Sequence, residues 1–152
     1  QKNVLEEKIV KAAVDKIIVK GSRVTYVASR GGGGSGNLDW PVHGSISQYF
    51  SGGHTGLDIA TRTGTAIRAA DSGRVTFAGY SGGYGNFIII SHGNGLVTRY
   101  AHCSSIAVSS GTNVSKGQVI GAVGTTGHST GPHLHFEVLS GGSFRNPLSY
   151  LR

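Results

Sequence analysis

Two short stretches of this sequence pair histidine with a carboxylate or with a second histidine. The first is HTGLD, from His54 to Asp58, and the second is HLH, from His133 to His135. On an extended strand, residues an even number of positions apart point to the same face. The spacing therefore predicts that His54 and Asp58 share one face, with Leu57 turned to the opposite, apolar side.

The strand expected around the second pattern is amphipathic. Even spacing puts His133, His135 and Glu137 on one face, whereas the alternate positions carry Leu, Phe and Val. The apolar face can pack on a core while the polar face presents ligand-type side chains from a rigid sheet. The pattern leaves two interpretations open: a functional site built on strands, or a chance pair of surface histidines.

These residue types suit zinc. Catalytic zinc commonly takes three nitrogen or oxygen ligands from the protein and keeps a fourth position for water. Such a metal lowers the pKa of water towards about 7 and polarises a carbonyl group. Proton transfer needs a further base, and the chain has seven histidines from which to supply one. The two patterns together predict a hydrolytic zinc site if the fold brings them together.

The elements that would position these residues are short apolar runs separated by glycine turns. Separators such as Ser81-Gly82-Gly83 and Gly93-Asn94-Gly95 are typical turn sequences, and no long window has a clean helical period. The sequence predicts an all-β domain, mostly antiparallel, with an open groove. The expected strands are residues 65–69, 74–79, 87–91, 96–101, 119–123 and 133–139.

Three regions differ in composition. Residues 1–30 are rich in charge and β-branched side chains, and predict a short β segment. Residues 31–37 contain the run GGGGSG and predict a flexible Gly/Ser linker. Residues 38–152 carry both histidine patterns and form the expected catalytic domain.

The overall composition indicates a folded and basic protein. Glycine contributes 26 of 152 residues, and 38% of the chain is apolar while only 14% is charged, unlike disordered chains. The formal net charge of +7 favours an anionic partner such as an acidic wall polymer. The basic residues are dispersed rather than interleaved with aromatics, so no nucleic-acid partner is expected.

The cysteine and apolar content restrict the chain further. Cys103 is the only cysteine, so neither an internal disulfide nor a cysteine-based zinc site can form. No apolar stretch approaches the ~18 residues needed to span a bilayer. The chain begins at Gln1 and contains no methionine, so we expect a processed product, with room for a signal peptide outside this sequence. A monomer is the default expectation.

The run from Trp40 to Leu148 resembles the lysostaphin-type (LytM-type) zinc endopeptidases, which cleave peptide bonds in bacterial peptidoglycan. The resembling segments occur in the family's order and at its usual spacing. They are GHTGLDIA (53–60), GTAIRAADSGRV (64–75), GYGNFIIISHGNGLVTRYAH (83–102), VSKGQVIGAVGTTG (114–127) and STGPHLHFEV (129–138). The resemblance implies a zinc endopeptidase domain over residues 38–152, with peptidoglycan peptides as substrates.

The resemblance also implies roles for five residues. His54, Asp58 and His135 match the ligands of the family's zinc, so one Zn²⁺ per chain is expected. His102 and His133 match two catalytic histidines that do not bind the metal but orient or deprotonate water and stabilise the developing oxyanion. The sequence does not decide how these two divide the work. A wall-binding or regulatory module of the same fold that makes no cuts is the alternative.

The stretch VLEEKIVKAAVDKIIVKGS near the N-terminus resembles the closing strands of a small five-glycine domain found in bacterial wall proteins. This resemblance implies that the parent protein is secreted, extracellular or associated with the wall of a bacterium, with a Gram-positive one expected. The basic charge would then help the enzyme approach anionic wall polymers.

Cys103 lies beside His102 and raises a Cys–His hydrolase as a further rival. Adjacent strand residues face opposite sides, so Cys103 is expected to be a small buried residue turned away from His102. Asp71 lies in an Asp-Ser-Gly sequence and is expected to serve a turn.

The sequence suggests one position for each of two further residues, and two alternatives for each of three others. His43 and His92 are expected to be exposed. His128 is expected on a surface loop, with a place in the groove as the alternative. Tyr84 is either a packed loop aromatic or a substrate contact, and Glu137 either supports His135 or forms a surface ion pair.

Overall fold

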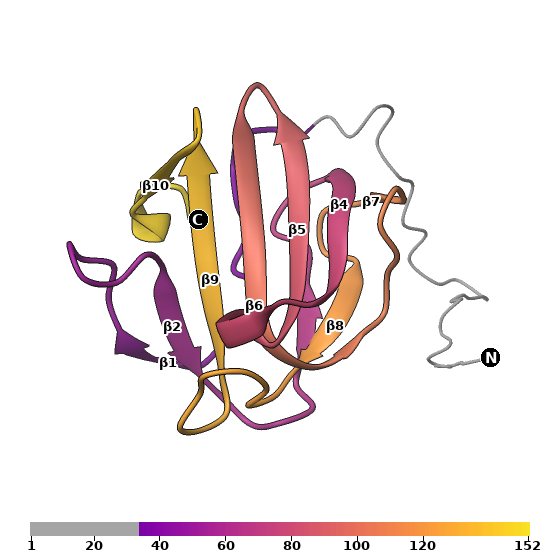
Figure 1. Ribbon diagram of the computed structural model, residues 1–152. Helices are drawn as coiled ribbons and strands as arrows, with labels where there is room; N and C mark the ends of the chain where they lie inside the picture. Colours follow the sequence, from indigo (N-terminus) through magenta and orange to yellow (C-terminus); the bar gives the residue numbers. More distant parts are fainter. Residues whose placement is uncertain (1–33) are drawn as a thin grey trace.

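The computed structural model describes residues 34–152, which form a single β-sheet with two short 3-10 helices (Figure 1). The predicted β segment at residues 1–30 and the first part of the predicted linker lie outside the described residues. Within residues 34–152 there is no helix long and apolar enough to cross a membrane.

The sheet has ten strands, and every pair of neighbouring strands is antiparallel. The 3-10 helices are η2 (Gly82–Tyr84) and η3 (Pro147–Ser149). The strands are β1 (Ser45–Gln48), β2 (Leu57–Ala60), β3 (Ala66–Arg68), β4 (Gly73–Tyr80), β5 (Asn86–Gly93), β6 (Leu96–Ile106), β7 (Asn113–Val114), β8 (Val119–Val123), β9 (His133–Ser140) and β10 (Ser143–Arg145). The all-β, antiparallel fold predicted from the sequence is confirmed.

The order of the main strands is β1-β2-β9-β6-β5-β4-β7. Strand β10 pairs with the C-terminal part of β9. Strand β8 pairs with the C-terminal part of β6 on one side and with β3 on the other. Strands β9 and β6 therefore lie side by side in the middle of the sheet (Figure 1). Strand β2 pairs with β9, which lies near the end of the chain, and this pairing creates the site described below.

All six predicted strands are present. The bounds of β8 are as predicted, and the other five differ by a few residues at one or both ends. Strands β1, β7 and β10 were not expected, because they span only two to four residues and show no clear alternation of apolar and polar side chains.

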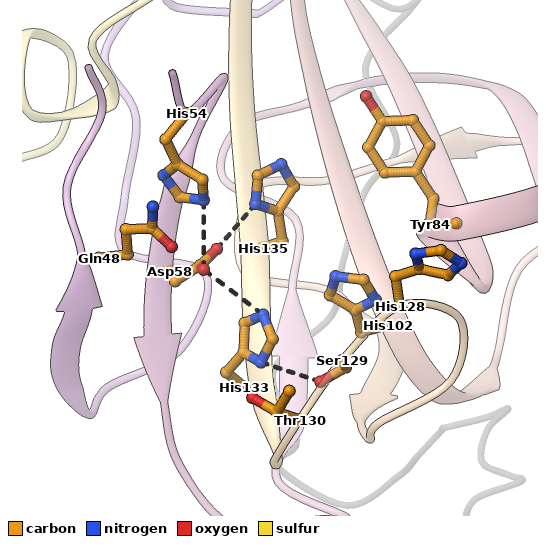
Figure 2. A pocket seen from close by; sticks show the side chains of 11 residues that line it. Gln48, His54, Asp58, Tyr84, His102, His128, Ser129, Thr130, His133 and His135 are labelled. Atoms are coloured by element: carbon orange, nitrogen blue, oxygen red, sulfur yellow. Dashed lines mark hydrogen bonds and ion pairs between the residues drawn. The ribbon is translucent and has the colours of Figure 1, made fainter. Parts of the chain in front are cut away.

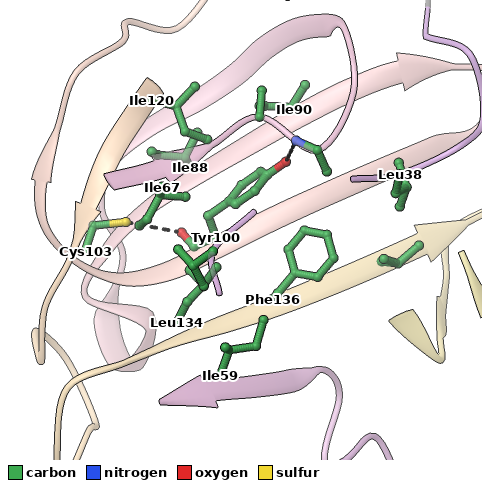
Figure 3. Packing of buried hydrophobic residues seen from close by; sticks show 14 of the residues in the cluster. Leu38, Ile59, Ile67, Ile88, Ile90, Tyr100, Cys103, Ile120, Leu134 and Phe136 are labelled. Carbon is green, nitrogen blue, oxygen red and sulfur yellow. Dashed lines mark hydrogen bonds between the residues drawn. The ribbon is translucent and has the colours of Figure 1, made fainter. Parts of the chain in front are cut away.

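The core lies on the face of β9 that carries Leu134, Phe136 and Val138, all of which are fully buried. Phe136 packs against Tyr100 of β6, with ring centroids 5.3 Å apart (Figure 3). Full burial of such a side chain stabilises the fold by about 1.5–3 kcal/mol relative to leaving it exposed. Residues at the alternate positions of β9 point the other way, so the predicted separation of faces on this strand is confirmed.

The end of the predicted linker lies against the domain. The backbone N–H groups of Ser35 and Gly36 donate to one carboxylate oxygen of Asp71, at 2.7 and 3.0 Å, and Gly34 donates to the carbonyl of His92 at 2.7 Å. Asp71 is only 2% exposed. It also accepts the N–H of Ser72, so it serves the predicted turn and in addition holds the incoming chain. The extent of the linker itself stays a prediction.

Candidate metal centre

Three adjacent strands, β2, β9 and β6, bring the predicted site residues to one face of the sheet. Asp58 is the register partner of His135, and Ala60 is the partner of His133. Ala101, the residue before His102, is the partner of His135 from the other side. Directly paired residues on antiparallel strands have Cβ atoms about 4.5–5.5 Å apart, so side chains on the shared face must meet.

Asp58 lies at the centre of the cluster (Figure 2). One of its oxygens is 2.7 Å from Nδ1 of His135, and the other is 3.2 Å from Nε2 of His54 and 3.6 Å from Nε2 of His133. His54, Asp58 and His135 can each offer one ligand atom such that all three lie within 4.8 Å of one another. Ligands about 2.1 Å from a tetrahedral zinc lie about 3.4 Å apart, so these three side chains fit that ion.

His54 reaches the cluster from a turn rather than from a strand. It forms an isolated bridge with Ser51, and β2 begins only at Leu57. The expectation that one extended strand runs from His54 to Asp58 is therefore wrong, although both side chains do reach the same cluster. Gly56 makes the turn possible, because a Cβ at this position would be 2.5 Å from the carbonyl oxygen of Phe136.

Hydrogen bonds orient the rings of His54 and His135. Nδ1–H of His54 donates to the carbonyl of Tyr49 at 3.1 Å, which leaves Nε2 facing Asp58. Both nitrogens of His135 face a carboxylate: Nε2 lies 2.8 Å from Glu137, and Nδ1 lies 2.7 Å from Asp58. Such partners are typical of metal-binding histidines, because they orient the ring and fix its tautomer.

The other two histidines are held in the same way. Nδ1–H of His102 donates to the carbonyl of Thr126 at 2.7 Å, and Nδ1–H of His133 donates to that of Gly131 at 2.9 Å. The Nε2 atom of each ring therefore carries a lone pair. The two rings lie with centroids 4.8 Å apart, and both line the groove.

His102 has an unusual backbone conformation, with φ of 64°, at a register shift between β5 and β6. The shift is a bulge that turns the histidine to the groove while Cys103 points into the core. The loop that supplies the Thr126 carbonyl packs backbone against backbone on Gly85, since a Cβ on Gly127 would lie 2.4 Å from the Gly85 nitrogen. Two glycines are thus required to hold His102 in place.

Electrostatics at the cluster favour a cation. Burial alone would raise the pKa of Asp58, but the hydrogen bond from His135 and the charges of the surrounding histidines lower it. Burial would likewise lower the pKa of His135, yet its hydrogen bonds to Asp58 and Glu137 raise it to about 9. The site therefore stabilises positive charge between Asp58 and Glu137, which is the condition for holding a divalent ion.

His102 differs from His135 in this respect. Burial lowers the pKa of His102 below its usual range, although the hydrogen bond to Thr126 opposes the shift. The ring is therefore neutral near pH 7, and its Nε2 can accept a proton.

The cluster lies in a groove of about 460 Å³. Gln48 of β1 lines one side, and η2 with the loop before β9 lines the other (Figure 2). The residues of that second side are Gly83, Tyr84, His128, Ser129 and Thr130. His128 is thus both exposed and part of the groove, so the alternative interpretation of this residue is confirmed. Tyr84 stacks on Phe87 at 4.3 Å and also lines the groove, which combines its two interpretations.

One further expectation is corrected. His92, expected to be exposed, is only 3% exposed and bonds through its two nitrogens to the Ser72 carbonyl and the Thr98 hydroxyl. Of the two interpretations of Glu137, contact with His135 is confirmed, since the side chain is fully buried and lies 2.8 Å from Nε2 of His135. His43 is exposed and Cys103 is fully buried, as predicted. Thr55, which bonds Glu137, was not singled out from the sequence, since a threonine between two ligand residues carries no signal of its own.

Comparison with known proteins agrees with this arrangement. Residues 52–147 match Peptidase family M23. Over 96 residues the chain is 52% identical to the DD-carboxypeptidase/endopeptidase Mpg of Neisseria meningitidis serogroup B, which covers 63% of this chain and 22% of that protein. Over 116 residues it is 42% identical to the murein hydrolase activator NlpD of Escherichia coli K12, which covers 74% of this chain and 30% of that protein. The chain thus spans less than a third of the length of these relatives.

Solved structures show the same fold. A zinc containing peptidase from Vibrio cholerae superposes with a TM-score of 0.69 and 33% identity, covering 72% of this chain and 39% of that one. The antimicrobial peptidase lysostaphin from Staphylococcus simulans superposes with a TM-score of 0.66 and 30% identity, covering 82% of this chain and 55% of that one. Since the family match extends over residues 52–147, more than half of the sequence, the chain belongs to Peptidase family M23.

Proposed function

We propose that the chain is a zinc-dependent endopeptidase that hydrolyses peptide bonds in the stem or crosslink of bacterial peptidoglycan. The observation that carries the proposal is the cluster of His54, Asp58 and His135, whose ligand atoms lie within 4.8 Å of one another in an open groove. His102 and His133 line the same groove with a lone pair on Nε2.

The residues that would hold one zinc ion are His54 through Nε2, Asp58 through its carboxylate and His135 through Nδ1. When bound, zinc supplies Lewis-acid chemistry that polarises a carbonyl and activates water at neutral pH. The hydrogen bonds from His54 to Tyr49 and from His135 to Glu137 hold both rings in the orientation that this set requires.

His102 and His133 would move protons and stabilise charge on the scissile group. His102 is neutral near pH 7 and its Nε2 is free to accept a proton from water. Nε2 of His133 is 3.6 Å from Asp58, on the side of the cluster away from His54. With its Nδ1–H bonded to the carbonyl of Gly131, His133 presents Nε2 to the groove, and a proton taken up there would stabilise a developing oxyanion.

The groove and the charge of the chain are consistent with a wall substrate. The groove is open, and an extended peptide can enter without a free end. The net charge of +7 would favour approach to anionic wall polymers. We accordingly propose a secreted or wall-associated monomer in a bacterium, with no nucleic-acid partner.

A non-catalytic regulatory role is the second candidate, because one relative is named as a murein hydrolase activator. All five residues expected of the hydrolase are present here, and the structure gathers them in one groove. A module that only binds or activates needs neither three metal ligands nor two oriented histidines. The arrangement therefore favours the hydrolase.

Digestion of purified peptidoglycan separates the two candidates. The chain is incubated alone with sacculi, and the released fragments are identified by mass spectrometry together with a count of new amine termini. A hydrolase releases peptide-linked fragments whose masses name the bond. An activator binds the sacculi without producing new termini and increases release only when a second hydrolase is added.

A further inference from the structure

One carboxylate next to the metal cluster enters the proposed function only as a hydrogen-bond partner that orients His135. Glu137 follows His135 by two positions on β9 and shares its face, yet its side chain is fully buried. Burial of an ionised carboxylate is costly unless hydrogen bonds and opposite charge compensate it. The compensation at Glu137 comes from four other residues.

A single oxygen of Glu137, Oε2, receives three of these contacts. Nε2–H of His135 donates to it at 2.8 Å, the hydroxyl of Thr55 at 2.5 Å and the hydroxyl of Tyr84 at 2.9 Å. Thr55 lies between the two ligands of the first pattern, and Tyr84 belongs to the groove wall. One atom thus joins a ligand, the loop between the other two ligands, and the substrate groove.

The second oxygen faces a cation. Oε1 of Glu137 lies 3.4 Å from the guanidinium of Arg99 and has no hydrogen-bond partner in the described part of the chain. Arg99 is held over the rings of Phe87, Tyr84 and Phe144, at 5.1, 5.4 and 5.9 Å from their centroids. Burial would raise the pKa of Glu137, but the donated hydrogen bonds from His135 and Thr55 lower it, so the carboxylate is ionised.

We propose that Glu137 is a positioning residue that selects Nδ1 of His135 as the metal-binding atom. When zinc is held beside Asp58, the carboxylate of Glu137 would keep the Nε2–H of the ring, so that Nδ1 is the atom left to bind the ion. The same carboxylate also accepts hydrogen bonds from Thr55 and Tyr84. These bonds fix the positions of the loop between His54 and Asp58 and of the groove wall relative to the His135 ring. This inference rests on the zinc site of the proposed function and adds the means by which its third ligand is oriented.

Among residues 34–152, no partner of His135 other than Glu137 can hold the proton on Nε2. His135 is 7% exposed, and besides Asp58 and Glu137 its only polar contact with these residues is the Thr55 hydroxyl, 3.4 Å from Nε2. That hydroxyl already donates to Glu137. Without the carboxylate, the ring can rotate or change tautomer and present Nε2 to the ion instead. Loss of such a partner typically weakens metal binding 10–100-fold.

The test uses the full chain, with zinc as the probe. Zinc affinity is measured by competition with a chromophoric chelator for the wild type, Glu137→Ala and Glu137→Gln. The matched control is Asp71→Asn, since Asp71 is also a buried carboxylate whose Oδ2 accepts three hydrogen bonds, but none of its contacts is a site residue. Long-range ¹H–¹⁵N NMR of the zinc-loaded wild type and variants then reports which nitrogen of His135 carries the proton.

The expected result is a zinc dissociation constant raised 10–100-fold by Glu137→Ala and less by Glu137→Gln, which keeps an oxygen acceptor. Asp71→Asn is expected to lower thermal stability while leaving the zinc affinity unchanged. The wild-type spectrum should show a proton on Nε2 of His135. The Glu137→Ala spectrum should show the proton on Nδ1 instead, or a mixture of the two tautomers.

Two outcomes would overturn the inference while leaving the zinc site intact. One is a folded Glu137→Ala protein with wild-type zinc affinity. The other is a zinc-loaded wild type in which the proton is on Nδ1 of His135, a result that needs no variant to fold. A wild-type chain that binds no zinc at all would instead contradict the proposed function itself.

Discussion

Asp58 and His135 are 77 residues apart in the chain, yet they are register partners on β2 and β9, and Oδ1 of Asp58 lies 2.7 Å from Nδ1 of His135. The pairing of these two strands creates the cluster, because it is the β2–β9 ladder that brings the first histidine pattern next to the second. Every prediction about the site depends on this contact.

Replacement of Asp58 by alanine should abolish zinc binding. The carboxylate contacts three histidines, so its loss removes one ligand and the negative charge that holds the others. Metal content is measured by mass spectrometry after equilibration at a free zinc concentration that saturates the wild type. His43→Ala, at an exposed histidine outside the groove, is the control and should retain a full complement. Stoichiometric zinc in the Asp58→Ala protein would show that the ligands lie elsewhere.

His102→Ala and His133→Ala should keep the metal and lose the reaction. Neither side chain belongs to the proposed ligand set, and general acid–base groups contribute about 10²–10⁴-fold to rate. We expect kcat/KM on peptidoglycan fragments to fall by about that factor while zinc content stays at the wild-type value. A variant that loses zinc together with activity would place its histidine among the ligands.

Thiol reagents should leave the proposed peptidase activity unchanged. Cys103 is fully buried, and burial raises the pKa of its thiol to about 12, so almost no thiolate exists at neutral pH. Iodoacetamide should label Cys103 only after denaturation, as followed by intact mass. Inhibition that parallels labelling of the native protein would revive the Cys–His hydrolase.

The fold should become less stable in mild acid because of His92. Burial lowers the pKa of His92 relative to the unfolded chain, despite the hydrogen bond to the Ser72 carbonyl. Below the unfolded value of about 6.5, the unfolded state binds more protons than the folded state, so this contribution to stability is lost as the pH falls. His135, whose pKa is raised to about 9, contributes in the opposite direction, with stability lost as the pH rises from 6.5 through 9.

The two effects separate in a comparison of the wild type with His92→Gln. The free energy of unfolding is measured by urea denaturation of both proteins between pH 8 and pH 5. The difference in the free energy of unfolding between the wild type and His92→Gln should shrink as the pH falls, because only the wild type carries the buried histidine. A difference independent of pH would mean that His92 is protonated as readily in the folded protein as in the unfolded chain.

The sequence alone predicted the strands that carry strong alternation. On β9 the apolar residues Leu134, Phe136 and Val138 go to the core, and His133 and His135 go to the opposite face, as a period of two requires. Short edge strands such as β1 lacked such a signal, because pairing with a neighbour rather than side-chain alternation defines them.

The features that the sequence does not predict depend on contacts between distant segments. His92 is buried because Ser72 and Thr98 supply partners for both of its nitrogens, and nothing near His92 in the sequence indicates this. His102 has a positive φ that only the bulge against β5 explains. Glu137 was recognised as sharing the face of His135, but its burial depends on Thr55 and Tyr84 from two other parts of the chain.

The zinc dependence of wall cleavage is tested most directly by stepwise reconstitution. Zinc is removed with a chelator, the chelator is washed out, and cleavage of a crosslinked peptidoglycan fragment is followed as zinc is added back in fractions of an equivalent. We predict no cleavage without metal, a linear rise with added zinc and a plateau at one equivalent per chain. Full cleavage by the metal-free protein, or no cleavage by the protein once one zinc is bound, would contradict a single-zinc endopeptidase.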